Sequence, residues 1–325
     1  MNSSSSPTLK VLRTLFGGVV RSTRGLPHAR ARQARLHVEK DVAYLPDGGV
    51  DHRLDVIRSR TAKGVQPALL YIHGGGFAVC TKETHEILTS TYASMGFTVF
   101  SINYRLAPEH PFPASFHDAC DALLWVLSHG AEYGADVRRL VVAGESAGAN
   151  LALCLALAAS RRDGSDARAA AVFDAEPTIQ ALLPACGLLQ VTDMARIWRS
   201  SPQNALTRNV LKRIQETYLP PTDLPECSLD WADPLLQVER RPLERSLPPT
   251  FVLCGTKDLL YGDSERLARA LTRLGVENEL LSEEGAGHAY HALVWTDASK
   301  RAWARQRSFL ARWVEGIDVR AASPF

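Results

Sequence analysis

The chain has 325 residues, of which 46% are hydrophobic and 22% are charged. A chain of this length and composition can bury a large core, which excludes wholesale disorder, and its 22 Gly and 18 Pro exclude collagen-like and low-complexity chains. The 37 basic and 35 acidic residues leave a formal net charge of +2, so we expect no nucleic-acid partner.

The amino-terminal segment is strongly basic. Residues 1–38 contain no acidic residue and seven basic ones: Lys10, Arg13, Arg21, Arg24, Arg30, Arg32 and Arg35. Apolar residues recur beside them at helical spacing: Leu9, Leu12, Phe16 and Val19. Two interpretations stay open, a segment packed on the protein's own body and a targeting or membrane-surface helix. The longest apolar stretch of the chain, 151–159, is far shorter than the roughly 20 residues that span a bilayer, so we expect no stable membrane insertion.

From residue 37 onward, short apolar runs alternate with helical patterns. Two alternating segments, 37–45 and 52–60, flank the turn sequence 46–49 and predict a β-hairpin. Further strands are expected at 68–72, 97–102, 140–143, 179–184, 250–254 and 277–282, and helices at 84–95, 115–129, 147–160, 263–274 and 298–314. Continuous apolar strands that alternate with helices indicate an α/β fold, with a mostly parallel sheet covered on both faces.

Residues 188–232 interrupt this alternation. They carry helical stretches followed by a Pro-rich run at 219–225. We expect a cap built from 1–36 and 188–232 over the carboxyl ends of the strands, and a catalytic core built from 37–187 and 233–325. The alternative is that 188–232 is a plain surface excursion of the core.

The sharpest motif is Gly-Glu-Ser-Ala-Gly at 144–148, which follows an apolar strand and precedes an Ala- and Leu-rich helix. A tight strand-to-helix turn holds its serine in a strained conformation and exposes the hydroxyl. A side chain two residues before or after the serine would collide, which explains Gly144 and Gly148. The pattern predicts Ser146 as a catalytic nucleophile.

A serine hydroxyl needs a base, and a histidine that acts as a base is oriented by an acid. Only His288 and His291 follow Ser146 among the ten histidines. We expect His288, in a Gly-rich loop after the last strand, to be the base, with His291 as the alternative. We expect Asp258, shortly after the strand at 250–254, to be the acid, whereas Asp263 more naturally caps the next helix.

A second glycine cluster, His73-Gly74-Gly75-Gly76, directly follows the apolar strand at 68–72. Bare backbone N–H groups here are suited to bind an oxyanion, and we expect Gly74, Gly75 and Ala147 to form the oxyanion hole. A phosphate-binding loop is the competing interpretation, but the sequence lacks the Gly-Lys-Ser/Thr ending and the spaced Gly-x-Gly-x-x-Gly of such loops.

These motifs resemble a known family. The run 73–76, the stretch NYRLAPEHPFPA at 103–114 and the motif at 144–148 are similar to the hormone-sensitive-lipase-like group of α/β-hydrolases, especially its bacterial carboxylesterases. The resemblance covers residues 37–315. It implies an eight-stranded α/β-hydrolase core with a helical cap, hydrolysis of short-chain acyl esters without a metal or cofactor, and a homodimer as a possible assembly.

The chain departs from the family pattern at three positions. Glu145 stands where aspartate is more frequent, and Ala149 and Cys80 stand where glycine is common. None of them belongs to the expected triad of Ser146, Asp258 and His288.

The sequence therefore predicts a serine carboxylesterase that hydrolyses short- to medium-chain acyl esters of small molecules through an acyl-enzyme on Ser146. A lipase acting on longer acyl chains and a non-catalytic small-molecule-binding member of the fold are the alternatives. The six cysteines have no short metal or redox spacing. We expect them to be buried free thiols of a cytoplasmic protein.

Overall fold

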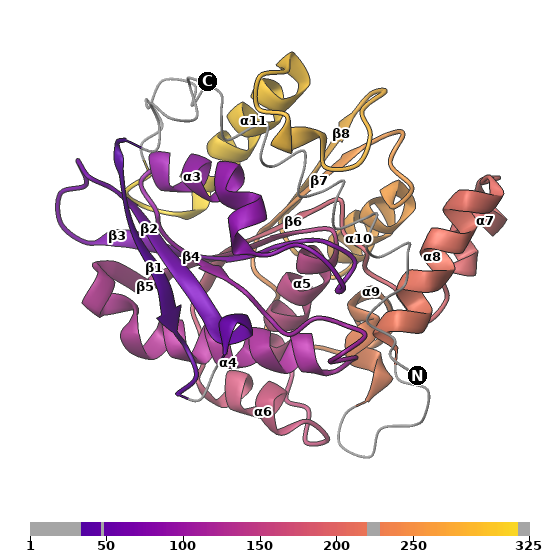
Figure 1. Ribbon diagram of the computed structural model, residues 1–325, viewed down its shortest axis with the longest axis horizontal. Coiled ribbons are helices and arrows are strands. Elements are labelled where there is room, and N and C mark those ends of the chain that lie inside the picture. The colour runs from indigo at the N-terminus through magenta and orange to yellow at the C-terminus, as the bar shows by residue number, and fades with distance from the viewer. Residues whose placement is uncertain (1–33, 47–48, 220–227, 318–325) are drawn as a thin grey trace.

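One eight-stranded sheet organises the computed structural model, which describes residues 34–46, 49–219 and 228–317 (Figure 1). The strand order is β1-β2-β4-β3-β5-β6-β7-β8. The strands are β1 (Leu36–Ala43), β2 (Arg53–Ser59), β3 (Gln66–Ile72), β4 (Thr98–Ile102), β5 (Ala135–Glu145), β6 (Ile179–Ala185), β7 (Thr250–Gly255) and β8 (Asn278–Glu283). β2 pairs antiparallel with both β1 and β4, and all other pairs are parallel. The predicted hairpin and the mostly parallel sheet are confirmed.

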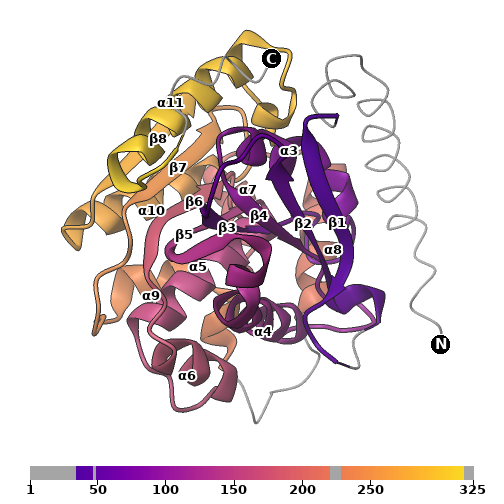
Figure 2. The same ribbon diagram turned by 90° about the vertical axis from the view of Figure 1, so that its left-hand side faces the viewer.

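Helices cover both faces of this sheet. They are α3 (Glu86–Ser94), α4 (Ala114–His129), α5 (Ala147–Ser160), α6 (Ala167–Asp174), α7 (Ala195–Ser200), α8 (Ala205–Tyr218), α9 (Pro234–Arg240), α10 (Tyr261–Arg273) and α11 (Asp297–Trp313). Figure 2 shows α3 and α11 on one face of the sheet and α4, α5 and α6 on the other. The five predicted core helices are confirmed, whereas α6 and α9 were not predicted because two turns are too short to show a period.

Each face of the sheet packs into its own apolar core. Along β3, Leu70 and Ile72 point into the core beneath α4 and α5, whereas Leu69 and Tyr71 point into the core beneath α3 and α11. All four side chains are buried, as expected where a parallel strand is covered on both sides. Helix α5 is buried along its whole length, which explains why its sequence is apolar all round.

Helices α7 and α8 fall within 188–232, between β6 and β7, and project beside the sheet at the right of Figure 1. Residues 1–33 and 220–227 lie outside the described residues, so the division into cap and core stays a prediction. Within the described ranges, no helix combines the length and hydrophobicity that crossing a membrane requires. The five cysteines in this part of the chain are free, and all but Cys80 are buried.

Candidate active site

Ser146 occupies the turn between β5 and α5 in a strained backbone conformation, with φ 57° and ψ −116°. Two close approaches impose this turn. A Cβ atom on Gly144 would lie 2.2 Å from the carbonyl oxygen of Gly148, and one on Gly148 would lie 2.1 Å from that of Ile72. Neither position tolerates a side chain, and a positive φ at a serine is strained. Ser146 thus has the tight turn and the strained backbone that the Gly-Glu-Ser-Ala-Gly motif predicts.

The turn places Ser146 in the wall of a cavity of about 410 Å³. Asp258 and His288 line the same cavity, so folding brings together the three residues that the sequence nominated. The backbone N–H of Ser146 donates to the carbonyl of Ala185 on the neighbouring strand β6, which fixes the turn at the carboxyl end of the sheet.

His288 and Asp258 form a direct pair. The Nδ1 atom of His288 lies 2.8 Å from Oδ2 of Asp258, and the other carboxylate oxygen accepts from the backbone N–H of Leu260. Loss of surrounding water lowers the pKa of His288, but the Cys186 sulfur and the Asp258 carboxylate raise it more strongly. The net direction is well above the ordinary pKa of histidine.

The two alternative residues are used elsewhere. His291 is buried against Trp303, and burial lowers its pKa to about 4. It does not line the cavity. Asp263 accepts from the backbone N–H of Leu189 and pairs with Arg196. Neither residue is positioned to replace Asp258 or His288.

The glycine loop after β3 differs from expectation in one respect. The N–H of Gly74 donates to Nε2 of His85 at 3.2 Å, and Gly74 does not line the cavity. Gly75 and Gly76 do line it, and among the described residues their N–H groups and that of Ala147 have no hydrogen-bond acceptor. The contact with His85 favours Gly75 and Gly76 over Gly74 as oxyanion donors.

Behind Ser146, Glu145 joins two histidines. Its Oε2 atom lies 3.2 Å from Nε2 of His85, and its Oε1 atom lies 3.8 Å from Nε2 of His288. Burial alone would raise the pKa of Glu145, but the contact with His85 and the charges of the surrounding histidines lower it to about 2. The sequence analysis missed the role of His85, because nothing in the segment around it signals a contact with residue 145.

Helix α8 closes one side of the cavity with Val210, Leu211 and Ile214. A Cβ atom on Gly76 would lie 3.3 Å from Cδ1 of Ile214, so this side chain packs directly against the glycine loop. The carboxyl end of α8 is fixed by Tyr218, which stacks on Phe77 with 3.7 Å between ring centroids.

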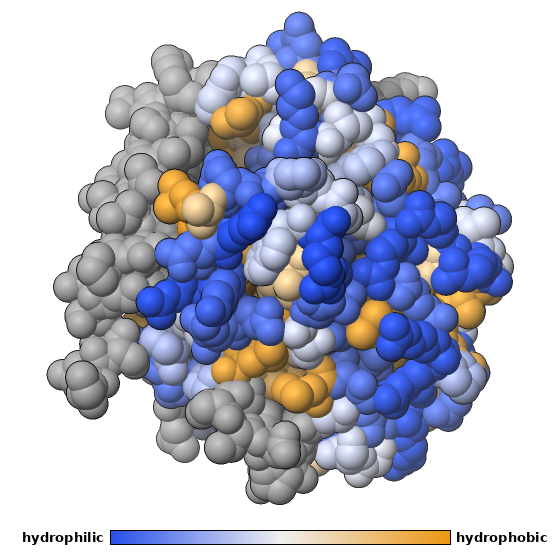
Figure 3. All heavy atoms as spheres, turned by 90° about the vertical axis from the view of Figure 1, so that its right-hand side faces the viewer, coloured by the Kyte–Doolittle hydropathy of each residue, from blue (hydrophilic) through white to orange (hydrophobic). Residues whose placement is uncertain are grey.

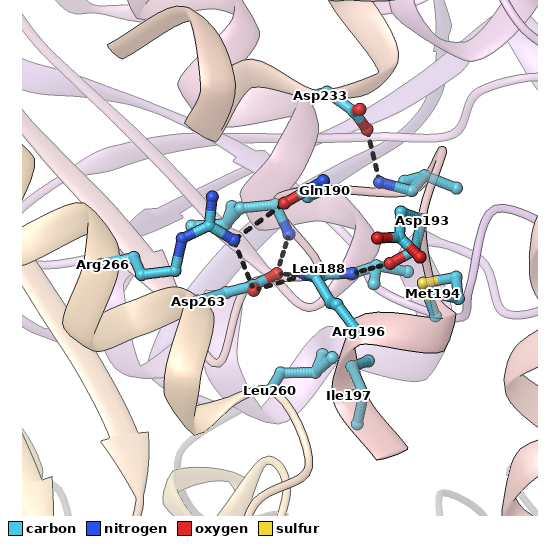
Figure 4. A network of polar contacts seen from close by, with 12 residues as sticks. Leu188, Gln190, Asp193, Met194, Arg196, Ile197, Asp233, Leu260, Asp263 and Arg266 are labelled. Atoms are coloured by element: carbon cyan, nitrogen blue, oxygen red, sulfur yellow. Dashed lines mark hydrogen bonds and ion pairs between the residues drawn. The ribbon is translucent and has the colours of Figure 1, made fainter. Parts of the chain in front are cut away.

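A buried polar network connects the segment before α7 to the first turns of α10 (Figure 4). Asp263 of α10 pairs with Arg196 of α7 and accepts from the N–H of Leu189. Arg266, one turn further along α10, donates to the side chain of Gln190 at 2.8 Å. Burial raises the pKa of Asp263, and Arg196 partly opposes this. The network attaches α7 to α10, the helix that directly follows the loop carrying Asp258.

Cys80 occupies a backbone position with φ 74°, where glycine is normally favoured. This explains in physical terms why a glycine is common there, and it shows that this chain tolerates the strain of a side chain.

Comparisons with known proteins agree with this geometry. A family model described as "alpha/beta hydrolase fold" matches residues 69–292. Carboxylesterase NlhH of Mycobacterium tuberculosis is 29% identical over 87% of this chain and 88% of its own. Esterase LipI of the same species is 30% identical over 69% of this chain and 65% of its own. Among solved structures, a bacterial heroin esterase has a TM-score of 0.77 at 25% identity, over 95% of this chain and 92% of its own. Esterase LipW of Mycobacterium marinum has a TM-score of 0.73 at 29% identity, over 95% of this chain and 90% of its own.

Proposed function

The chain belongs to the hormone-sensitive-lipase-like carboxylesterase family of the α/β-hydrolase fold and is a carboxylic ester hydrolase. We propose that it cleaves short- to medium-chain acyl esters through an acyl-enzyme on Ser146. The observation that carries this proposal is the meeting of Ser146 with the Asp258–His288 pair in one cavity. The strained turn presents the serine, and the paired imidazole lines the same cavity and has the chemistry to take its proton.

In the first half of the reaction, the Nε2 atom of His288 takes the proton of the Ser146 hydroxyl as its oxygen bonds to the ester carbonyl carbon. Asp258 accepts from the Nδ1–H group, which fixes the tautomer and stabilises the imidazolium. The N–H groups of Gly75, Gly76 and Ala147 bind the oxyanion of the tetrahedral intermediate. The imidazolium then gives its proton to the departing alcohol, and the acyl group remains on Ser146.

The second half reverses these roles with water as the nucleophile. His288 takes a proton from water as the oxygen attacks the acyl carbon, and the same N–H groups bind the second oxyanion. When the intermediate collapses, the proton on His288 returns to the Ser146 oxygen and the carboxylic acid leaves.

We propose that α7 and α8 act as a cap that shapes the acyl pocket. Two apolar residues of α8, Val210 and Leu211, line the cavity, and Ile214 lies against the glycine loop. Walls of this kind bind acyl chains through the hydrophobic effect. A cavity of about 410 Å³ matches ligands of modest size and favours short and medium chains over long ones.

The outer surface of this cap also favours dissolved esters over a lipid interface. The face of the molecule that carries α7 and α8 is largely hydrophilic where it is drawn in colour, and its hydrophobic patches are small and separate (Figure 3). Exposed charged residues of the two helices that do not line the cavity include Arg199 and Lys212, whereas Arg213 and Glu216 are exposed and line it. A lipase lid that docks on oil would present a contiguous apolar surface instead.

A chain-length series of soluble nitrophenyl esters, from acetyl to palmitoyl, tests this proposal. We expect kcat/KM to peak within the short and medium chains and to fall for the longest. Emulsified long-chain triacylglycerol should be hydrolysed much more slowly than a dissolved butyryl ester. A maximum at palmitoyl, with activation at the oil interface, would contradict the assignment.

A further inference from the structure

Three side chains with metal-binding atoms meet beside the nucleophile. One ligand atom of each of Glu145, Cys186 and His288 lies within 4.8 Å of those of the other two, and 3.8 Å separates Oε1 of Glu145 from Nε2 of His288. Glu145 ends β5, Cys186 directly follows β6, and His288 follows β8. Because distant parts of the chain supply them, no short spacing in the sequence indicates this group.

Glu145 and His288 are each already oriented by a second residue. Asp258 holds Nδ1 of His288, which leaves Nε2 directed at the group, and His85 lies against Oε2 of Glu145, which leaves Oε1. Metal-binding histidines commonly use one ring nitrogen for the metal while the other donates to a carboxylate. The pairing that prepares a catalytic base therefore also prepares a metal ligand.

The separation of Glu145 from His288 is close to that of two ligands of a tetrahedral ion. Zinc bonds of about 2.0–2.2 Å to nitrogen and oxygen place these two ligands roughly 3.4 Å apart at the tetrahedral angle. The observed 3.8 Å differs from this by a few tenths of an ångström, which small side-chain rotations can absorb. Glu145 and His288 line the cavity, so an ion has a route from solvent, and a water molecule can take the fourth position.

We propose that Glu145, Cys186 and His288 form an inhibitory site for Zn²⁺. A thiolate, an imidazole and a carboxylate together suit a borderline cation such as zinc, whereas Mg²⁺ and Ca²⁺ prefer oxygen ligands alone. On binding, the thiol of Cys186 releases its proton to solvent, and the lone pair of His288 Nε2 bonds to the metal. That lone pair is the one that takes the proton of Ser146, so ester hydrolysis stops until the metal is removed.

The inhibition by zinc rests on the proposed role of His288 as the catalytic base. The binding of zinc to the three side chains does not depend on that role. Hydrolysis of a soluble butyryl ester should fall as ZnCl₂ is added to the full-length enzyme, should recover on addition of EDTA, and should not respond to MgCl₂. EDTA alone should leave the rate unchanged.

A substitution at the sulfur ligand identifies the site. Cys186→Ser should need a zinc concentration higher by roughly 10- to 100-fold for half inhibition, each enzyme being compared with itself without zinc. Cys120→Ser is the matched control, because Cys120 is also a buried free thiol but lies in α4 within the other core. Equal zinc sensitivity of Cys186→Ser and the wild type would overturn the proposal.

X-ray absorption at the zinc edge gives a readout that needs no variant. The wild-type enzyme with one equivalent of zinc should show one sulfur at about 2.3 Å together with nitrogen and oxygen ligands at about 2.0–2.2 Å. A spectrum without sulfur would refute the site. A spectrum with sulfur but undiminished hydrolysis would support the site and contradict the role of His288, so the two proposals fail in different ways.

Discussion

The Nδ1 atom of His288 lies 2.8 Å from Oδ2 of Asp258, although thirty positions separate these residues in the chain. The two side chains meet because each follows one of two adjacent parallel strands, β7 and β8, at the same edge of the sheet. The pairing leaves Nε2 of His288 directed toward Glu145 and stabilises the protonated form of the ring.

The pH dependence of hydrolysis should reflect this pairing. The pKa of His288 is raised well above its ordinary value of 6.5. Only the neutral ring can take the proton of Ser146, so kcat/KM should rise with pH and reach half its plateau above pH 6.5. Asp258→Asn removes the carboxylate charge, so this midpoint should move to lower pH while the plateau falls. A midpoint that Asp258→Asn leaves in place would contradict the pairing, and a plot of log kcat/KM against pH for both enzymes decides.

His85 should act as a positioning residue for the glycine loop. It accepts from the N–H of Gly74 and lies against Glu145, but it does not line the cavity. His85→Ala should reduce kcat by about 10- to 100-fold with little change in KM, because a small displacement of the oxyanion donors affects the transition state more than substrate binding. His129→Ala, which removes a histidine stacked on Trp125, is the control. A change confined to KM would show that His85 instead shapes the substrate pocket.

Ile214 should limit the length of the acyl chain. It packs against Gly76 from helix α8. Ile214→Ala opens this side of the cavity and should move the optimum of the chain-length series toward longer esters, whereas Ile214→Trp should move it toward acetyl. Leu206→Ala serves as the control, because Leu206 lies on the same helix and is 73% exposed. Identical chain-length profiles for all three variants would show that α8 does not shape the acyl pocket.

The ion pair between Arg196 and Asp263 should contribute to stability. Asp263 is buried and keeps Arg266 and the Leu189 N–H as neighbours, so Arg196→Ala should lower the free energy of unfolding by about 2–3 kcal/mol. Arg199→Ala breaks an exposed pair with Asp193 and should lower it by less than about 1 kcal/mol. Denaturant unfolding of both variants measures the difference, and equal losses would contradict this role for the buried network.

The sequence was most informative where chemistry is local. The motif around Ser146 names the two glycines whose close approaches impose the turn, and the order of strands nominated Asp258 and His288 without any knowledge of distances. The sequence could not show that the N–H of Gly74 bonds to His85, because that contact depends on how the loop after the glycines folds back. Nor could it show that Cys186 meets His288, since their proximity arises only when β6 and β8 join one sheet.

The most direct test of the central claim is the turnover of a soluble butyryl ester by Ser146→Ala, with circular dichroism to verify that the variant is folded. We predict a loss in kcat on the order of 10⁶, together with the disappearance of the acyl adduct that mass spectrometry should detect on the wild-type enzyme during turnover. A folded Ser146→Ala variant that hydrolyses the ester at the wild-type rate, or that still forms the acyl adduct, would show that the nucleophile is a different residue.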